Sequence, residues 1–511
     1  MKNKSQIKTG ILLSYLNIGI GNLVPLFYTP IMLSLLGKSE YGLFRIASST
    51  TSYLSLMAFG VGGAITRFVI KANIDEGKEG EERIFGLFNL LFQIISILTI
   101  LVGLILTLNL GLFYSNSLSI EELNKMKILV GIMVINTAVG FSATPYTIIV
   151  SAHEKFIFIQ IMNIISTVAV PIANLVVLYM GFKSIAMAIV SLALNVIVRI
   201  AYLAYVHKTL QLKPKYRNMP FFQIKEILAF SFWLFVSSVT SQLFSATDTV
   251  IIGTVPALAT VGAAVYSVGH TFPSILQSIS QVVPNFFMPR ANKMVFSGSD
   301  NEELTDLTIK VGRIQAYVVA LVAFGFVAFG QPFLNFYVGP DYSEAYWVAI
   351  IMIIPNCIPL VQSACNSVMQ AKNLHSFRAK VYIFIAIANA VSTYFLVQHF
   401  GIIGASIPTG LCYILGNGLI LNSFFWKKMQ LNIPRFWKNI LPFFILAIML
   451  CAITIGLSFV IDFNNLLYFF IGVLIFTIAY LLLSWFLILN EYEKDIVLQP
   501  LKKLRRRNAG K

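Results

Sequence analysis

The chain has 511 residues, of which 57% are hydrophobic and only 11% are charged. Because soluble proteins carry about a quarter charged residues, this composition excludes an ordinary soluble enzyme or binding domain. A formal net charge of +16 would suggest a nucleic-acid partner in a soluble protein. Here we attribute the charge to loops that face anionic lipid head groups, and we expect no nucleic-acid partner.

Long apolar stretches follow one another along the chain, each long enough to cross a membrane as a helix. We therefore expect an all-α integral membrane protein with about fourteen transmembrane helices. The expected spans are 10–36, 42–70, 84–109, 126–151, 157–179, 184–206, 227–252, 257–289, 311–337, 345–370, 378–398, 403–425, 440–461 and 465–489.

The basic residues gather at the N-terminus, in every second loop and in the C-terminal tail. Such loops mark the cytoplasmic side of a membrane protein. The sequence thus predicts a multi-pass protein of the bacterial plasma (inner) membrane with both termini in the cytoplasm. The predicted cytoplasmic loops are 71–83, 152–156, 207–226, 290–310, 371–377 and 426–439, and the basic tail is expected to lie on a lipid surface.

The two halves of the chain resemble each other. "LLGKSEYGLFRIASS" (35–49) occupies the place of "IIGTVPALATVGAAVYSVG" (251–269), and "YMGFKSIAMA" (179–188) that of "HFGIIGASIP" (399–408). Each half has six spans, so both share one orientation, as in transporters built from parallel repeats. We expect an N-lobe (1–206), a basic linker (207–226), a C-lobe (227–425), two extra helices (426–489) and a tail (490–511).

These motifs resemble those of a polysaccharide flippase of the multidrug/oligosaccharidyl-lipid/polysaccharide exporter superfamily. The carrying segments are "LLGKSEYGLFRIAS", "SATDTVIIG…VGAAVYSVG", "SAHEKF" and the glycine-containing turns at 181–186 and 401–406, and the likeness covers about residues 1–425. The resemblance implies two six-helix lobes around a cavity and movement of undecaprenyl-diphosphate-linked oligosaccharides to the outer leaflet by alternating access. It implies a role in surface polysaccharide (O-antigen, lipopolysaccharide or capsule) assembly.

Charges inside spans are costly and are therefore candidates for function. Arg45 and Arg67 lie 22 residues apart in span 42–70, which in a continuous helix puts them about 40° and about 33 Å apart. The alternative is a bend at glycines 60, 62 and 63 that spoils this alignment. Arginine matches phosphate oxygens, so both are predicted substrate contacts, with snorkelling to the interface as the alternative. Under the repeat, Arg290 lies at the same depth in the membrane as Arg67. We predict that the two arginines together receive the diphosphate from the inner leaflet; the alternative is that Arg290 is only one of the basic residues that mark the cytoplasmic side.

Asp248 is the acid within the predicted spans. We expect it to pair with Arg45 across two neighbouring spans and to close an outer gate that a proton or Na⁺ releases. The alternative is a structural ion pair that never opens.

Polar side chains on two spans are predicted to face the cavity and bind sugar hydroxyls. His270 shares a helix face with Gln277, and Asn22 is a similar candidate in the first span. A neutral histidine satisfied by its neighbours is the alternative for His270.

Two other functions remain open. A multidrug or cation antiporter of the same superfamily would need a buried acid in the N-lobe, whereas the first six spans contain none. A membrane-embedded polysaccharide polymerase would need a sizeable outer loop, and none is present. The four cysteines (357, 365, 412 and 451) are expected to be packing residues. We expect no catalytic residue, metal or cofactor beyond H⁺ or Na⁺, and a polymerase and a chain-length regulator as partners.

Overall fold

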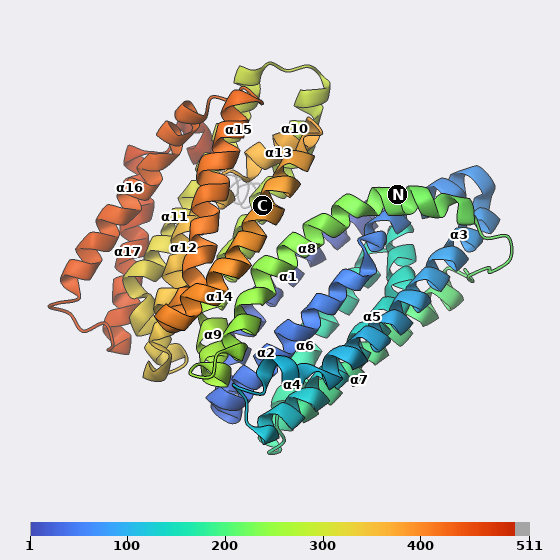
Figure 1. Ribbon diagram of the computed structural model, residues 1–511. Coiled ribbons are helices and arrows are strands. Elements are labelled where there is room, and N and C mark those ends of the chain that lie inside the picture. The colour runs from blue at the N-terminus through green and yellow to red at the C-terminus, as the bar shows by residue number, and fades with distance from the viewer. Residues whose placement is uncertain (1, 496–511) are drawn as a thin grey trace, which may run out of the picture. The chain divides into compact units, whose positions relative to one another are not determined.

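The computed structural model describes residues 2–495, and all regular elements within this range are helices (Figure 1). The basic tail predicted to lie on a lipid surface falls almost entirely outside the described residues. The all-α prediction is confirmed.

The chain forms two compact units, of which unit 1 holds residues Met1–Ser267 and Tyr382–Ala405. Its elements are α1 (Lys2–Leu36), α2 (Lys38–Ser52), η1 (Tyr53–Ala58), α3 (Val61–Leu108), α4 (Leu110–Tyr114), α5 (Ile120–Ala152), α6 (Phe156–Tyr179), α7 (Ser184–Ala204), η2 (Tyr205–Thr209), η3 (Phe221–Gln223), α8 (Ile224–Thr254), the start of α9 (Ala259–Ser280) and the middle of α14 (His375–Tyr413).

Unit 2 holds residues Val268–Val381 and Ser406–Lys511. Besides the remaining parts of α9 and α14, it contains α10 (Val282–Phe296), α11 (Asn301–Tyr337), η4 (Pro340–Tyr342), α12 (Glu344–Val361), α13 (Ser363–Ala371), η5 (Ile414–Leu421), α15 (Asn422–Lys427), α16 (Ile433–Leu457) and α17 (Leu466–Leu487). The predicted N-lobe and C-lobe were defined by the internal repeat, whereas these units are defined by packing. The boundaries of the lobes therefore stay a prediction.

Within the described residues, ten helices are long and apolar enough to cross a membrane, or eleven if one bent pair counts as a single span. Two of the ten run through a predicted loop and turn there at a glycine: α3 joins the end of span 42–70 to span 84–109, and α14 joins span 378–398 to span 403–425. Gly77 interrupts α3 with φ 63° and Gly401 interrupts α14 with φ 60°, a region that favours glycine. The protein is a multi-pass membrane protein, as predicted.

The prediction of one continuous helix over 42–70 is wrong. Helix α2 ends at Ser52, a short 3₁₀ turn follows, and α3 begins at Val61 after Phe59 and Gly60 adopt φ values of 47° and 67°. A Cβ on Gly60 would lie 2.7 Å from the carbonyl oxygen of Ser231 on α8. The chain therefore breaks where it passes against another helix, which span length alone does not reveal.

The expected span 257–289 is also broken. Helix α9 ends at Ser280 and α10 begins at Val282 and continues to Phe296. Arg290 therefore lies within α10 and not at the end of a helix, because the helix continues past the apolar run into the predicted loop.

The core of unit 1 forms where α3, α5 and α7 lie side by side (Figure 1). Phe85, Phe88 and Phe92 of α3 are buried there with Ile149 of α5. The ring of Phe85 meets that of Tyr146 edge to face at 5.2 Å between centroids, a favoured aromatic geometry. Helix α6 packs against α1 on another side of the unit.

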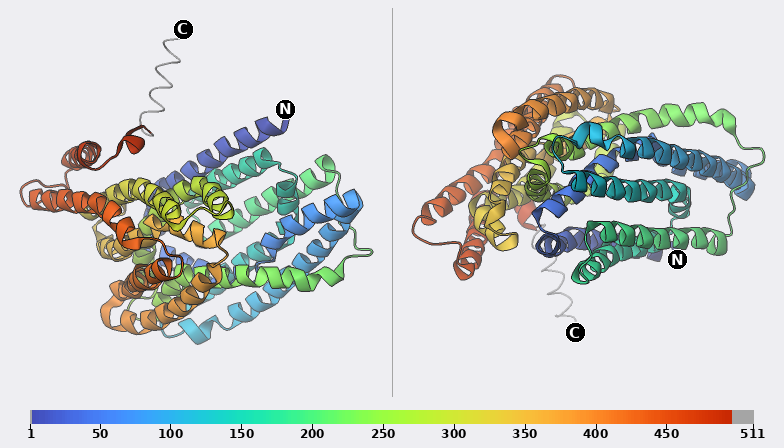
Figure 2. Two further views of the ribbon diagram at one scale, coloured as in Figure 1. Left: turned by 90° about the horizontal axis from the view of Figure 1, so that it is seen from above. Right: turned by 60° about the horizontal axis from the view of Figure 1, so that its bottom comes forward.

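In unit 2, α11 packs against α12, α16 and α17, and the two views in Figure 2 show α16 and α17 (red) side by side. Arg313 of α11 holds these helices together at one end. Its guanidinium donates to both carboxylate oxygens of Glu493, at 2.6 and 2.8 Å, and to the carbonyl oxygens of Asn439 and Ile488. Both side chains are buried.

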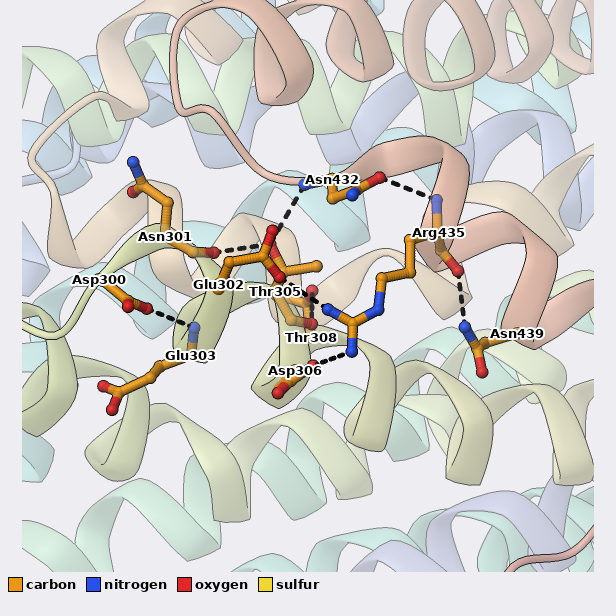
Figure 3. A network of polar contacts seen from close by, with 10 residues as sticks. All are labelled: Asp300, Asn301, Glu302, Glu303, Thr305, Asp306, Thr308, Asn432, Arg435 and Asn439. Atoms are coloured by element: carbon orange, nitrogen blue, oxygen red, sulfur yellow. Dashed lines mark hydrogen bonds and ion pairs between the residues drawn. The ribbon is translucent and has the colours of Figure 1, made fainter.

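The start of α11 is fixed to the start of α16 by a polar network (Figure 3). Arg435 lies 2.7 Å from Glu302 and 2.8 Å from Asp306, and the backbone N–H of Asn432 donates to the hydroxyl of Thr305. Asp300 caps α11 by accepting from the N–H of Glu303, as N-cap residues do. These contacts attach the first of the two extra helices to the preceding bundle.

Candidate functional site in the membrane-spanning helices

Helix α2 lies along α8, which confirms that the second and seventh spans are neighbours. The contact is close because Gly253 of α8 faces α2: a Cβ on Gly253 would lie 2.9 Å from Ile46. Polar side chains continue the contact towards the break after α2. Gln242 donates to the Ser52 hydroxyl, and the Tyr53 hydroxyl lies 2.5 Å from that of Thr247.

Arg45 stands on α2, half-buried, one turn after buried Tyr41 and one turn before buried Ser49. Its Nε atom is buried and, among the described residues, has no hydrogen-bond partner. A buried Nε–H of this kind is a donor that lacks an acceptor. Whether Arg45 contacts the substrate stays a prediction.

The remaining arginines lie in different settings. Arg67 is exposed on α3, beyond the break after α2, so the calculated 40° and 33 Å relation to Arg45 no longer applies. Arg290 is exposed on α10 in unit 2. Whether Arg67 and Arg290 act together stays a prediction.

Asp248 is 2% exposed on α8. Its carboxylate accepts hydrogen bonds from the Tyr266 hydroxyl of α9 at 2.5 Å and from the Thr393 hydroxyl of α14 at 3.1 Å. Asn389, one turn before Thr393, is also buried. The predicted gate residue thus accepts from hydroxyl groups of two other helices, and the pair with Arg45 stays a prediction.

The sequence did not indicate Tyr266 or Thr393 as partners of Asp248. Thr393 lies 145 residues away, and threonine is common on apolar spans. A search for polar residues on spans 257–289 and 378–398 would have found both as candidates, but not the contact.

The predicted sugar-binding residues are half-buried or exposed. His270 on α9 accepts or donates at Nδ1 to the Ser274 hydroxyl at 3.3 Å, and Gln277 two turns on is exposed. Asn22 of α1 donates to the Ile18 carbonyl oxygen one turn earlier at 2.8 Å. These contacts lie within single helices, and sugar binding by these residues stays a prediction.

The interior of unit 1 holds a polar seam that includes Arg199, a basic residue within the expected span 184–206; sequence reasoning missed its contacts. Asn195 of α7 donates to Asn136 of α5 at 3.3 Å. One turn further on both helices, the guanidinium of Arg199 lies over Gly140, where a Cβ would be 3.0 Å from it. The signal was present as Asn-x₃-Gly on one span and Asn-x₃-Arg on another, each on one helix face.

Two contacts of glutamate side chains fix the ends of the unit 1 helices. Glu40 lies 2.8 Å from Lys125 and accepts from the Ser184 hydroxyl. Burial tends to raise the pKa of Glu40, but the hydrogen bonds from Lys125 and Ser184 and the Lys125 charge outweigh it and hold the pKa below its ordinary value. At the other end, buried Glu81 accepts from Asn73 and lies 2.6 Å from His153.

The four cysteines are free and buried, which confirms their predicted place in the packed helices. Within residues 2–495, no three His, Cys, Asp or Glu side chains come together in a way that could hold a metal ion.

The structure resembles solved transporters. One is a lipid II flippase, MurJ, in an inward closed conformation. The alignment covers 96% of this chain and 99% of MurJ, with a TM-score of 0.74 at 15% identity. Another is the multidrug transporter DinF-BH. The alignment covers 84% of this chain and 96% of DinF-BH, with a TM-score of 0.59 at 12% identity. These likenesses show the fold.

Two curated proteins are similar in sequence. A probable low-salt glycan biosynthesis flippase, Agl15 of Haloferax volcanii, is 22% identical over 52% of this chain and 54% of its own length, so the chain spans about half of that relative. An uncharacterized membrane protein, EpsK of Bacillus subtilis, is 19% identical over 93% of this chain and 94% of its own length. The printed description of Agl15 agrees with the resemblance stated from the motifs.

Residues 7–288 match the family described as "Polysaccharide biosynthesis protein". This match spans more than half of the 511 residues, and it includes α2, α8 and α9, which carry Arg45, Asp248 and His270. The chain therefore belongs to the polysaccharide biosynthesis protein family.

Proposed function

We propose that the protein is a flippase that moves undecaprenyl-diphosphate-linked oligosaccharide repeat units from the inner to the outer leaflet of the bacterial plasma membrane by alternating access. It is a transporter and not an enzyme, and it serves O-antigen or capsule assembly. The family match over residues 7–288 is the observation that carries this proposal.

The charges inside the membrane favour an anionic cargo. Arg45 offers a buried Nε without a hydrogen-bond partner among the described residues, and arginine binds phosphate oxygens as a planar fork. The diphosphate of a lipid-linked glycan is the matching group. Arg67 and Arg290 are proposed to receive it at the inner leaflet, and His270, Gln277 and Asn22 to contact the sugars.

Asp248 is the proposed coupling residue. A proton or Na⁺ at its carboxylate would neutralise a buried charge that now accepts from Tyr266 and Thr393. Loss of the charge would release a contact with Arg45 and open the outer gate. Both termini are proposed to be cytoplasmic, and a polymerase and a chain-length regulator to receive the product.

Replacement of Asp248 tests this coupling. The Asp248→Asn variant should insert and accumulate normally but lose export, because it removes the charge while the amide still hydrogen-bonds: its oxygen accepts from one hydroxyl and its NH₂ donates to the other. The Thr393→Val variant is the matched control and should retain most export, since it removes one hydrogen bond and keeps the titratable group. Wild-type export by Asp248→Asn would end the gate proposal.

A multidrug antiporter is the second candidate, because structures of such transporters share the fold. The first six predicted spans contain no acid, and the buried acid of α3, Glu81, is occupied by contacts with Asn73 and His153; both points argue against a cationic cargo. Deletion of the gene distinguishes the two. A flippase deletion should accumulate lipid-linked repeat units on the inner leaflet, whereas an antiporter deletion should leave them unchanged and alter drug resistance. A polymerase deletion should leave single repeat units on the outer leaflet.

A further inference from the structure

The basic segment between α7 and α8 is fixed to α3 along much of its length. We call residues 210–220 the strap. The backbone N–H of Lys215 donates to the carbonyl oxygen of Glu82 at 2.9 Å, and the Lys215 ammonium lies 3.5 Å from Glu79 and from Glu82. Buried Asn89 donates to the Tyr216 hydroxyl at 2.7 Å.

Gly86 allows the strap to lie directly on α3. A Cβ at this position would be 1.9 Å from the carbonyl oxygen of Lys215, so another residue here would displace the strap. Leu212 is 2% exposed and belongs to the core that contains Phe85 and Phe88. The strap is therefore a docked part of unit 1 with one side chain anchored in the core.

The docked strap and its ends present cations and aromatic rings to the surroundings. The exposed cations are Lys208, Lys213, Lys215, Arg217 and Lys225, against one acid, Glu226, in 207–226. Tyr216 is 55%, Phe221 52% and Phe222 82% exposed. Such exposed rings are costly in water and therefore call for a partner.

The position of the strap indicates what this partner is. One helix able to cross a membrane ends at Thr209, and the bent pair that could form the next begins at Phe221. The strap thus lies at a membrane surface, where aromatic rings settle at the head-group level and lysine and arginine attract anionic lipids. A protein partner would have to compete with that lipid surface.

We propose that the strap, held on α3 through Gly86, forms with the adjoining residues 221–225 a binding surface for the anionic phospholipid head groups of the membrane that the chain spans. Lys213, Arg217 and Lys225 bind the phosphates, and Phe222 inserts beside them. This function does not depend on which cargo the protein moves.

A fluorophore at position 222 tests the proposal. The full-length Phe222→Cys chain is labelled and placed in phosphatidylcholine bilayers that contain either nitroxide-labelled phosphatidylglycerol or the same fraction of nitroxide-labelled phosphatidylcholine. The native cysteines are buried and should label poorly. We expect several-fold stronger quenching by the anionic lipid, because each surface cation raises its local concentration about fivefold.

Matched variants separate the contributions. Lys213→Gln, Arg217→Gln and Lys225→Gln together should abolish the preference while Lys215 keeps the strap docked. Gly86→Val should weaken it by displacing the strap. The control is Phe113→Cys on α4, an exposed ring (60%) without a basic residue between Arg83 and Lys125, which should show equal quenching by both lipids.

Equal quenching at position 222 by the two lipids would overturn the proposal. So would a preference that survives the triple glutamine variant, or one unchanged in Gly86→Val. A probe at position 222 that is shielded from both lipids in native membranes would indicate a protein partner, and this result would also overturn the proposal.

Discussion

Arg313 and Glu493 form a buried, bidentate ion pair, and the pair joins residues 180 positions apart. The Arg313 guanidinium also lies 5.1 Å from the centre of the Phe443 ring. The sequence did not indicate this role, because Arg313 stands close to a predicted cytoplasmic loop and looks like one more positive-inside residue. The Asn490 side chain accepts from the N–H of Glu493. This short-range contact could be anticipated from the sequence, but the pairing of Glu493 with Arg313 could not.

Replacement of one member of this pair should be severe. Arg313→Met leaves the Glu493 carboxylate buried without its cation and should lower the free energy of unfolding by about 3–5 kcal/mol. The double variant with Glu493→Leu should recover most of the loss, since neither charge remains. Denaturation by SDS, followed by circular dichroism, measures both. Equal losses in the single and double variants would contradict a charge-based effect.

The Glu40 contact predicts a pH dependence of stability. Its pKa is held below the ordinary 4.5, so the stabilisation is complete above that value and is lost as pH falls through the lowered pKa. Glu40→Gln should cost about 1 kcal/mol at neutral pH, and the difference from wild type should shrink below pH 4.5. Glu79→Gln, whose side chain is 67% exposed, should change little at any pH. A difference that grows in acid would contradict the assignment.

At the scale of helices, the sequence predicts uninterrupted spans well, but it predicts the positions of helix breaks poorly. The expected spans 157–179 and 465–489 correspond to α6 (Phe156–Tyr179) and α17 (Leu466–Leu487), because each is one apolar run between polar loops. The break between α2 and α3 arises where Gly60 meets the α8 backbone. Such a tertiary contact leaves only a glycine in the sequence, and glycines are frequent in membrane helices.

Close packing at the start of α2 can be tested with two glycines. A Cβ on Gly42 would lie 1.7 Å from the carbonyl oxygen of Thr260, whereas nothing lies within 4 Å of a Cβ on Gly131 of α5. Gly42→Ala should therefore destabilise the fold by about 1–3 kcal/mol. Gly131→Ala should be neutral or stabilising by up to about 1 kcal/mol. Thermal unfolding in detergent compares them, and similar midpoints would show that α2 can move away from Thr260 without cost.

At the scale of the whole molecule, the family could be read from short motifs, while the packing units could not, and the parallel repeat stays a prediction. Unit 1 includes α8 and residues Tyr382–Ala405, although the repeat assigns both to the second half of the chain. Contacts such as the one from Thr393 to Asp248 account for this grouping. Sequence similarity between repeats reports common ancestry of segments, and it does not report which helices pack together.

Reconstituted transport tests the proposed function most directly. Lipid-linked repeat units that accumulate in the deletion strain provide the substrate, and the purified chain is placed with them in liposomes. A membrane-impermeant oxidant of sugar diols then reports the glycans on the outside. Wild-type protein should expose the inner pool over time. Arg45→Ala should be slower by at least about tenfold, if the lost phosphate contact is worth about 1.5–3 kcal/mol, and Arg45→Lys should fall between them. Exposure no faster than in protein-free liposomes would contradict flipping, and equal rates for wild type and Arg45→Ala would contradict the role of this arginine.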